Sequence, residues 1–154
     1  MSAYFFDSSS LVKRYSKETG TTWIISIFKP NKDNRIYVAR ITFVEVISAL
    51  SRKARGGQID SSSEIKAVGR FRRAFHGKFR PVEISPNLTE HAAQLVRKHF
   101  LRGYDAVQLA AALQIYQKRN SLGLSPLTFV CADNKLNDAA KAEGLAVENP
   151  NNYP

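Results

Sequence analysis

Short apolar runs alternate with amphipathic segments along the whole of this 154-residue chain. The runs have the length and the aromatic or β-branched content of strands, and the segments between them carry apolar residues at helical spacing. Neighbouring parallel strands need a long connection that crosses over the sheet, and this connection is usually a helix. Strands that alternate with helices are therefore expected to pair in parallel. We therefore expect a single α/β domain with a mostly parallel five-stranded sheet and helices on both faces. The predicted strands are residues 3–6, 36–39, 82–84, 127–131 and 145–147.

Capping residues and helix breakers bound the predicted helices. Ser, Thr and Asp are favoured at helix N-termini, and glycine is common just past a helix end. Ser85-Pro86, for example, combines an N-cap with a first-turn proline. Because Asn149-Pro150 follows the last predicted strand, we expect a folded domain over residues 1–150 and a C-terminal tail over residues 151–154. The predicted helices begin near Ser8, Thr21, Thr42, Ser61, Pro86, Asp105 and Asp133.

The chain is strongly basic, with a net charge of +10 and only 13 Asp plus Glu. Lys and Arg supply much of the affinity for nucleic acid through phosphate contacts, so this balance favours a polyanionic partner. A lipid surface is less favoured, because the chain has no clean basic amphipathic helix. Three phenylalanines among the basic residues, Phe71, Phe75 and Phe79, are interpreted as core residues. The candidate nucleic-acid-binding residues, whose alternative role is a solvated helix face, are Arg52, Lys53, Arg55, Arg70, Arg72 and Arg73.

The location expected from the sequence is the cytoplasm. A single cysteine, Cys131, excludes an internal disulfide framework and suits a reducing compartment. No uninterrupted apolar stretch approaches the ~20 residues that span a bilayer, so no membrane association is expected. The apolar run that ends at Asp7 is too short for the apolar region of a signal peptide.

Four acids lie in apolar surroundings, where a carboxylate loses water at a cost unless a cation stabilises it. Asp7 and Asp133 each follow a predicted strand. Glu45 and Asp105 lie near the N-terminal ends of predicted helices. Taken singly, Asp7 and Asp133 could be N-caps, and Asp105 could be placed by the helix dipole. Taken together, the four acids share the edge of the sheet where ligand sites form in parallel α/β proteins.

Several carboxylates at one edge repel one another, and a bound divalent metal is the usual remedy. Mg²⁺, with Mn²⁺ as an alternative, prefers such oxygen ligands. A metal of this kind lowers the pKa of a bound water and offsets charge on the leaving oxygen in phosphodiester hydrolysis. The sequence therefore predicts metal-dependent chemistry on nucleic acid, with the same four residues as the catalytic and metal-binding set: Asp7, Glu45, Asp105 and Asp133.

Five segments, taken in order, resemble the motifs of PIN-domain ribonucleases, and more narrowly those of the VapC-type toxins of bacterial and archaeal toxin–antitoxin pairs. Each segment alone is a weak signal, but the ordered set covers the whole chain. The resemblance implies a Rossmann-like PIN fold and a Mg²⁺-dependent endoribonuclease that hydrolyses RNA. The segments are residues 4–13, 43–50, 101–110, 129–136 and 144–150.

The same resemblance implies a homodimer that is the toxin of the pair and is inhibited by a cognate antitoxin lying across the active site. By position, the four acids carry over as the acidic cluster, and Ser8 carries over as a hydroxyl that supports the first Asp or its metal. Two positions depart from the family pattern: Ser10 stands where Ala is usual, and Val107-Gln108 stands where Leu-His is common. Neither departure removes a carboxylate, although substrate choice could differ.

Two other classes of function compete with the nuclease hypothesis. A non-catalytic basic RNA-binding module with a PIN-like fold would be expected to lose one or more carboxylates, whereas the four acids here are intact. A phosphatase of the haloacid dehalogenase type also begins with an Asp after a strand. That chemistry requires a second Asp two residues later, where this chain has Ser9. Within the nuclease hypothesis, DNA stays open as an alternative substrate.

Overall fold

Five parallel strands form one sheet in the computed structural model, which describes residues 1–154. The sheet order is β3-β2-β1-β4-β5, and every neighbouring pair is parallel. The predicted α/β architecture is therefore confirmed. The chain builds outward from β1 on one side and then returns to β4 on the other, so β1 and β4 flank the topological switch point. The strands are β1 (Ala3–Phe6), β2 (Arg35–Ala39), β3 (Arg80–Val82), β4 (Leu127–Val130) and β5 (Ala146–Glu148).

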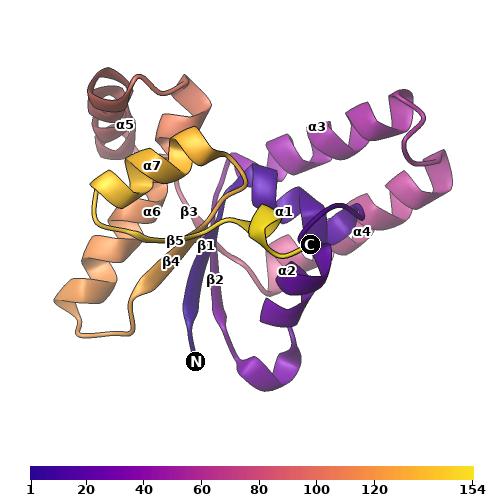
Figure 1. Ribbon diagram of the computed structural model, residues 1–154, viewed down its shortest axis with the longest axis horizontal. Coiled ribbons are helices and arrows are strands. Elements are labelled where there is room, and N and C mark those ends of the chain that lie inside the picture. The colour runs from indigo at the N-terminus through magenta and orange to yellow at the C-terminus, as the bar shows by residue number, and fades with distance from the viewer.

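Helices cover both faces of the sheet, with α1 to α4 on one side and α5 to α7 on the other (Figure 1). None of the helices combines the length and the apolar character that a membrane span requires. Two short 3₁₀ helices, η1 (Pro30–Lys32) and η2 (Pro150–Asn152), complete the fold. The α-helices are α1 (Ser8–Tyr15), α2 (Thr21–Ile27), α3 (Thr42–Arg55), α4 (Ser61–Gly77), α5 (Pro86–His99), α6 (Gly103–Ser121) and α7 (Asn134–Ala142).

The central strand β1 supplies side chains to two separate cores, because successive residues of a strand point to opposite faces. Phe5 belongs to the core under α5, α6 and α7, where its ring lies 5.9 Å from that of Phe129. Phe6 belongs to the core under α1 to α4. Fully burying one such ring stabilises the fold by roughly 1.5–3 kcal/mol. The second core also contains the three phenylalanines predicted to be buried, Phe71, Phe75 and Phe79, which confirms that prediction.

One strand lies two residues earlier than predicted. β3 spans Arg80–Val82 rather than 82–84, because these residues pair in register with Tyr37–Ala39 of β2. Ile84 lies beyond the sheet and is 38% exposed. The predicted N-cap at Ser85 is confirmed, since its hydroxyl accepts a hydrogen bond from the backbone N–H of Leu88. The sequence therefore located the strand–helix junction correctly but missed the register.

The chain continues as ordered structure beyond Pro150, where the sequence predicted that it would end. Residues 150–152 form η2, and the ring of Tyr153 stacks on Trp23 of α2 with centroids 4.4 Å apart. The Tyr153 hydroxyl also donates a hydrogen bond to Glu148 at 2.7 Å. Gly20 permits this packing, since a Cβ there would lie 2.3 Å from the carbonyl oxygen of Pro150. Residues 150–153, called the C-terminal clasp, therefore pack against α2 and do not form a free tail.

Candidate active site

Asp7 lies directly after β1 and is only 3% exposed. It caps α1, because its carboxylate accepts hydrogen bonds from the backbone N–H of Ser10 at 3.0 Å and from the Ser9 hydroxyl at 2.8 Å. Burial raises the pKa of Asp7, and these hydrogen bonds oppose that rise. Asp7 is therefore the N-cap of α1, and the same carboxylate lies at the carboxyl end of β1, where the site was predicted.

The hydroxyl that donates to the Asp7 carboxylate belongs to Ser9. The role that the resemblance implies for Ser8, support of the first Asp or of its metal, stays a prediction. Ser9 also accepts a hydrogen bond from the backbone N–H of Ala132 at 3.2 Å, which ties the end of β1 to the segment after β4. Ser8 lies instead near Glu45, where its hydroxyl lowers the pKa of that carboxyl.

Glu45 lies in the first turn of α3 and is half-buried. Its carboxylate accepts a hydrogen bond of 2.7 Å from the side-chain amide of Gln108 on α6. Burial raises the pKa of Glu45 most strongly, and repulsion from Asp7 and Asp105 raises it further. Glu45 is thus the electrostatic neighbour of two other acids contributed by different elements.

Asp105 lies in the first turn of α6, and Asp133 is the N-cap of α7. Burial, followed by repulsion from Asp133, raises the pKa of Asp105, while Arg102 and Lys135 lower it. Asp133 is exposed, and its carboxylate accepts hydrogen bonds from the backbone N–H groups of Lys135 at 2.8 Å and Leu136 at 3.1 Å. Repulsion therefore links the acids in the order Asp7, Glu45, Asp105 and Asp133, a series called the acidic row.

The ligand type of the acidic row suits a hard divalent cation, although its side chains do not lie close enough together to surround one. All its donors are carboxylate oxygens, and the raised pKa values of three of them mark a site where charge is poorly compensated. Beside Glu45, the side-chain oxygen of Gln108 is buried without a hydrogen-bond partner. No group of three or more His, Cys, Asp or Glu side chains lies close enough to hold a metal ion. The acids therefore interact electrostatically without forming a preformed metal cage, and their joint role as metal ligands stays a prediction.

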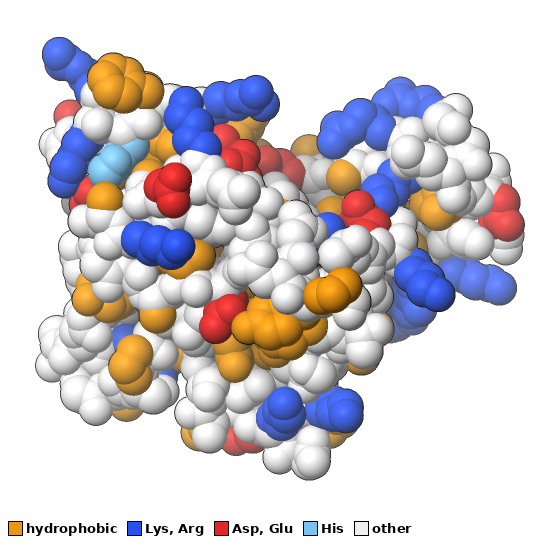
Figure 2. Space-filling model, in the orientation of Figure 1, with side chains coloured by type: hydrophobic (Ala, Val, Ile, Leu, Met, Phe, Trp, Pro, Cys, Tyr) orange, Lys and Arg blue, Asp and Glu red, His pale blue; other side chains and the backbone are white.

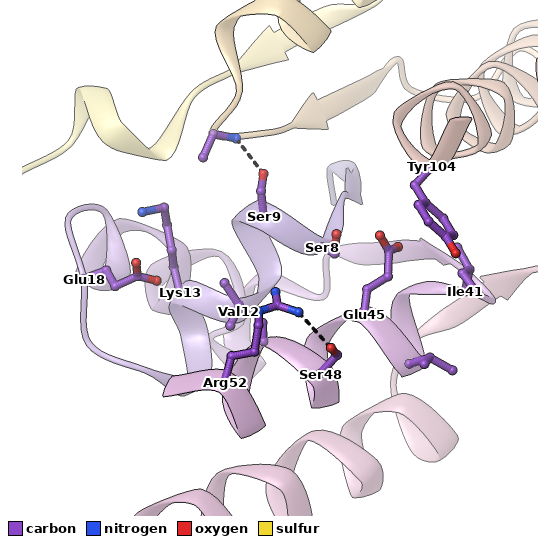
Figure 3. Close-up of a pocket in the computed structure, with 13 residues that line it drawn as sticks. Ser8, Ser9, Val12, Lys13, Glu18, Ile41, Glu45, Ser48, Arg52 and Tyr104 are labelled. Atoms are coloured by element: carbon purple, nitrogen blue, oxygen red, sulfur yellow. Dashed lines mark hydrogen bonds between the residues drawn. The ribbon is translucent and has the colours of Figure 1, made fainter. Parts of the chain in front are cut away.

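Of the four acids, Glu45 lines a groove with a volume of about 660 Å³. Glu45 and Tyr104 lie toward one end, and Lys13 and Glu18 lie toward the other, with Arg52 between them (Figure 3). Acidic side chains are also visible in the hollow between the α7 half of the molecule and the α3–α4 arm (Figure 2). The groove therefore has an acidic end at Glu45 and an opposite end, called the cationic end, where Lys13 and Arg52 lie with Glu18.

The candidate nucleic-acid-binding residues do not share one surface. Arg52 lines the groove, whereas the neighbouring Lys53 forms an ion pair of 3.3 Å with Glu18. Arg70 and Arg73 line a different pocket, and the guanidinium of Arg72 lies 5.1 Å from the ring centroid of Phe43. The sixth, Arg55, is exposed at the end of α3. Lys and Arg side chains are nevertheless frequent over the α3–α4 arm (Figure 2).

Sequence reasoning did not single out two residues for the site: Gln108, which contacts Glu45, and Lys13, which lines the groove. Gln108 is 1% exposed, and its amide donates to both Glu45 and the Thr42 hydroxyl, at 2.7 and 2.8 Å. Lys13 is 7% exposed and lines the cationic end of the groove. The only signal for either residue was its place inside a motif. Cys131, by contrast, is fully buried, and burial raises the pKa of its thiol.

A five-stranded parallel sheet with acids after β1 and β4 is an arrangement that a PIN domain would have. The sequence matches the family described as PIN domain over residues 4–141, and the chain belongs to this family. It is 32% identical over 147 residues to Ribonuclease VapC45 and to Ribonuclease VapC49, both of Mycobacterium tuberculosis. Each alignment covers 96% of this chain and 95% of the relative. The resemblance to VapC-type PIN-domain ribonucleases is therefore confirmed.

Solved structures share the fold at lower sequence identity. A toxin–antitoxin complex from Klebsiella pneumoniae contains a chain that matches with a TM-score of 0.61 and 21% identity. The match covers 96% of this chain and 97% of that chain. The shared fold therefore extends over almost the whole of this chain.

Proposed function

We propose that this protein is a Mg²⁺-dependent endoribonuclease that acts as the toxin of a toxin–antitoxin pair. The observation that carries the proposal is the row of four electrostatically linked carboxylates, of which Glu45 lines the groove, in a chain with a net charge of +10. The two Mycobacterium tuberculosis relatives that this chain resembles over nearly its full length are named ribonucleases, which supports the same activity here.

The four acids, Asp7, Glu45, Asp105 and Asp133, would hold the cation. When bound, a Mg²⁺ or Mn²⁺ ion supplies an activated water and offsets charge on the leaving oxygen. The remaining groups orient the acids. Ser9 and the Ser10 backbone N–H hold Asp7, and the Gln108 amide holds Glu45. Without a cation, the repulsion along the row would keep a phosphodiester away from the acidic end.

The proposed partners are an RNA substrate, a cognate antitoxin and a second copy of the chain. The net positive charge favours RNA, since phosphate contacts dominate nucleic-acid affinity. The Klebsiella pneumoniae structure of similar fold is a toxin–antitoxin complex, which supports an antitoxin as partner. A cytoplasmic location is proposed with it, because the single cysteine is buried and unpaired.

A non-catalytic RNA-binding module is the second candidate, and one specific observation favours it. No three acidic, His or Cys side chains lie close enough to hold an ion. A row held apart in this way would still allow the basic residues to bind RNA. The haloacid dehalogenase type of phosphatase is disfavoured, because Ser9 supports Asp7 where that chemistry needs a second acid.

Cleavage of cellular RNA by the purified protein tests the proposal. The reaction is run with Mg²⁺, with Mn²⁺ and with EDTA, and the EDTA sample is then supplied with excess Mg²⁺. The proposal predicts cleavage at defined positions with metal, none with EDTA, and recovery after the metal is restored. Folded protein that binds RNA but leaves it intact with either metal would instead support the binding module.

A further inference from the structure

A buried lysine without a partner lies at the cationic end of the groove. Lys13 of α1 is only 7% exposed, and its ammonium group makes neither an ion pair nor a hydrogen bond. Its position in α1 is fixed, because its carbonyl oxygen accepts a hydrogen bond of 2.7 Å from the Thr21 hydroxyl. The ammonium is not among the buried polar atoms that lack a partner, so it is open to the groove, where an anionic ligand could pair with it.

The nearest acid in the groove is already engaged. Glu18 lines the same end, but it forms its ion pair with Lys53 at 3.3 Å. Lys53 also donates a hydrogen bond of 3.1 Å to the Ser16 hydroxyl, which holds the Lys53 side chain in place. No ion pair joins Glu18 to Lys13. The protein therefore leaves the charge of Lys13 available to whatever enters the groove.

A second cation faces the same space. Arg52 of α3 is exposed, lines the groove, and spends one donor on the Ser48 hydroxyl at 2.8 Å. That bond orients the guanidinium and leaves most of its five N–H donors free. Arg guanidinium and Lys ammonium groups are the usual phosphate binders in proteins. Figure 3 shows Arg52 between Lys13 and Glu45, so the cationic end adjoins the acidic row.

We propose that Lys13 and Arg52 form a phosphate subsite that holds a backbone phosphodiester of RNA beside the one to be cleaved. The proposal rests on the proposed function, because it assigns the anion to the RNA substrate. The acidic row repels a phosphodiester that has no cation to meet it. Affinity for the backbone therefore has to come from the other end of the groove, and the subsite sets which phosphodiester reaches Glu45.

The test is the salt dependence of RNA binding, measured by fluorescence anisotropy with a labelled short single-stranded RNA of mixed sequence. An Asp105→Asn background prevents cleavage. Into it are placed Lys13→Met, which keeps an apolar stem of similar length, and Arg52→Gln on the exposed surface. The matched control is Lys17→Gln, which removes one charge from an exposed position outside the groove. Thermal melting of each variant verifies that it is folded.

Each lost phosphate contact should lower the slope of log affinity against log salt by about 0.7 for single-stranded nucleic acid. Lys13→Met and Arg52→Gln are expected to show this loss and to weaken binding roughly three- to tenfold at moderate salt, whereas Lys17→Gln matches the background. Should Lys13→Met fail to fold, the Arg52→Gln result decides alone.

Two results would overturn the subsite. An unchanged slope in the folded subsite variants would do so while leaving the nuclease proposal intact, and so would an equal loss in Lys17→Gln, since binding would then be diffuse. If the parent protein binds no RNA even at low salt, the proposed function fails along with the subsite, and the two failures are distinguished by that parent measurement.

Discussion

The side-chain amide of Gln108 donates a hydrogen bond of 2.7 Å to the carboxylate of Glu45, across 63 residues of sequence. The same amide nitrogen donates to the Thr42 hydroxyl at 2.8 Å, so one buried group joins α6 to two residues of α3. Because a carboxylate only accepts hydrogen bonds, this contact requires the amide nitrogen, and not the oxygen, to face Glu45. Gln108 thus fixes the direction of an acid that no neighbour on its own helix holds.

Replacing Gln108 with Leu should reduce RNA cleavage by about 10- to 100-fold, as is typical when a group that orients a metal-site acid is removed. Stability should change by less than about 1 kcal/mol, because the substitution also removes the buried amide oxygen that has no partner. Gln108→His, which retains a donor, should recover part of the activity. Cleavage rates and melting temperatures of the two variants check this, and full activity in Gln108→Leu would show that Glu45 needs no such support.

Ionisation of Asp105 should destabilise the metal-free protein. Burial and Asp133 raise its pKa in the folded state, so the folded protein binds that proton more tightly than the unfolded chain does. The resulting stability is fully present below the unfolded pKa and is lost as pH rises through the folded pKa. Asp105→Asn should therefore raise the melting temperature near pH 7, by on the order of 2 °C, and have little effect near pH 3. Asp138→Asn, on the exposed side of α7, is the matched control.

Divalent metal should reverse the order of melting temperatures, so that the wild type becomes more stable than Asp105→Asn. A cation that binds the folded protein raises its melting temperature, and the stabilisation grows with the logarithm of its concentration relative to Kd. Added Mg²⁺ or Mn²⁺ should therefore stabilise the wild type and Asp138→Asn by the same amount and should stabilise Asp105→Asn less. Differential scanning calorimetry with metal or EDTA measures the three shifts. Equal stabilisation of all three proteins would place the cation elsewhere on the chain.

Lys53 and Arg52 should differ in RNA binding although they are adjacent in the sequence. The charge of Lys53 is paired with Glu18 and its side chain is 19% exposed, so Lys53→Gln should leave the salt slope of RNA binding close to that of the parent. The cost should appear in stability, at roughly 0–1 kcal/mol for a pair that is partly exposed. Chemical denaturation and anisotropy on the same preparation separate the two effects. A loss of about 0.7 from the slope would mean that Lys53 leaves Glu18 and contacts a phosphate when RNA binds.

The clasp at the C-terminus should contribute to stability and not to catalysis. Tyr153→Ala removes the stack on Trp23 and the hydrogen bond to Glu148, with an expected loss of about 1–2 kcal/mol. Tyr153→Phe keeps the stack and should lose less than half of that. Activity measured well below the melting temperature should match the wild type for both variants. If Tyr153→Ala is as stable as the wild type, the last residues are dispensable for the fold.

Local chemistry was sufficient to predict most of the fold and the place of the acids. The apolar run before Asp7 and the one before Asp133 identified two strands, and both acids proved to be N-caps at their carboxyl ends. The position of Glu45 and Asp105 followed from topology, because helices after parallel strands begin at the same edge. These inferences depend on neighbours in sequence and on a rule that holds for all parallel sheets.

What escaped prediction depends on contacts between distant elements. The bond from Gln108 to Glu45 exists only because α6 packs beside α3, and nothing in either motif reports that packing. The basic residues cluster in the sequence but lie on different surfaces of the protein. Lys53 pairs with Glu18, whereas Arg70 and Arg73 of α4 line a separate pocket. The clasp was missed for the same reason, since Tyr153 finds Trp23 from the far end of the chain.

The central claim is that the acidic row performs the chemistry, and one comparison tests it most directly. Wild type, Asp105→Asn and Asp138→Asn are purified side by side and incubated with RNA and Mg²⁺ under single-turnover conditions, with folding verified by circular dichroism. The account predicts that wild type and Asp138→Asn cut at the same positions at similar rates, while Asp105→Asn is slower by at least about 100-fold, as expected on loss of a group acting in the transition state. Equal cleavage by all three proteins would contradict the account.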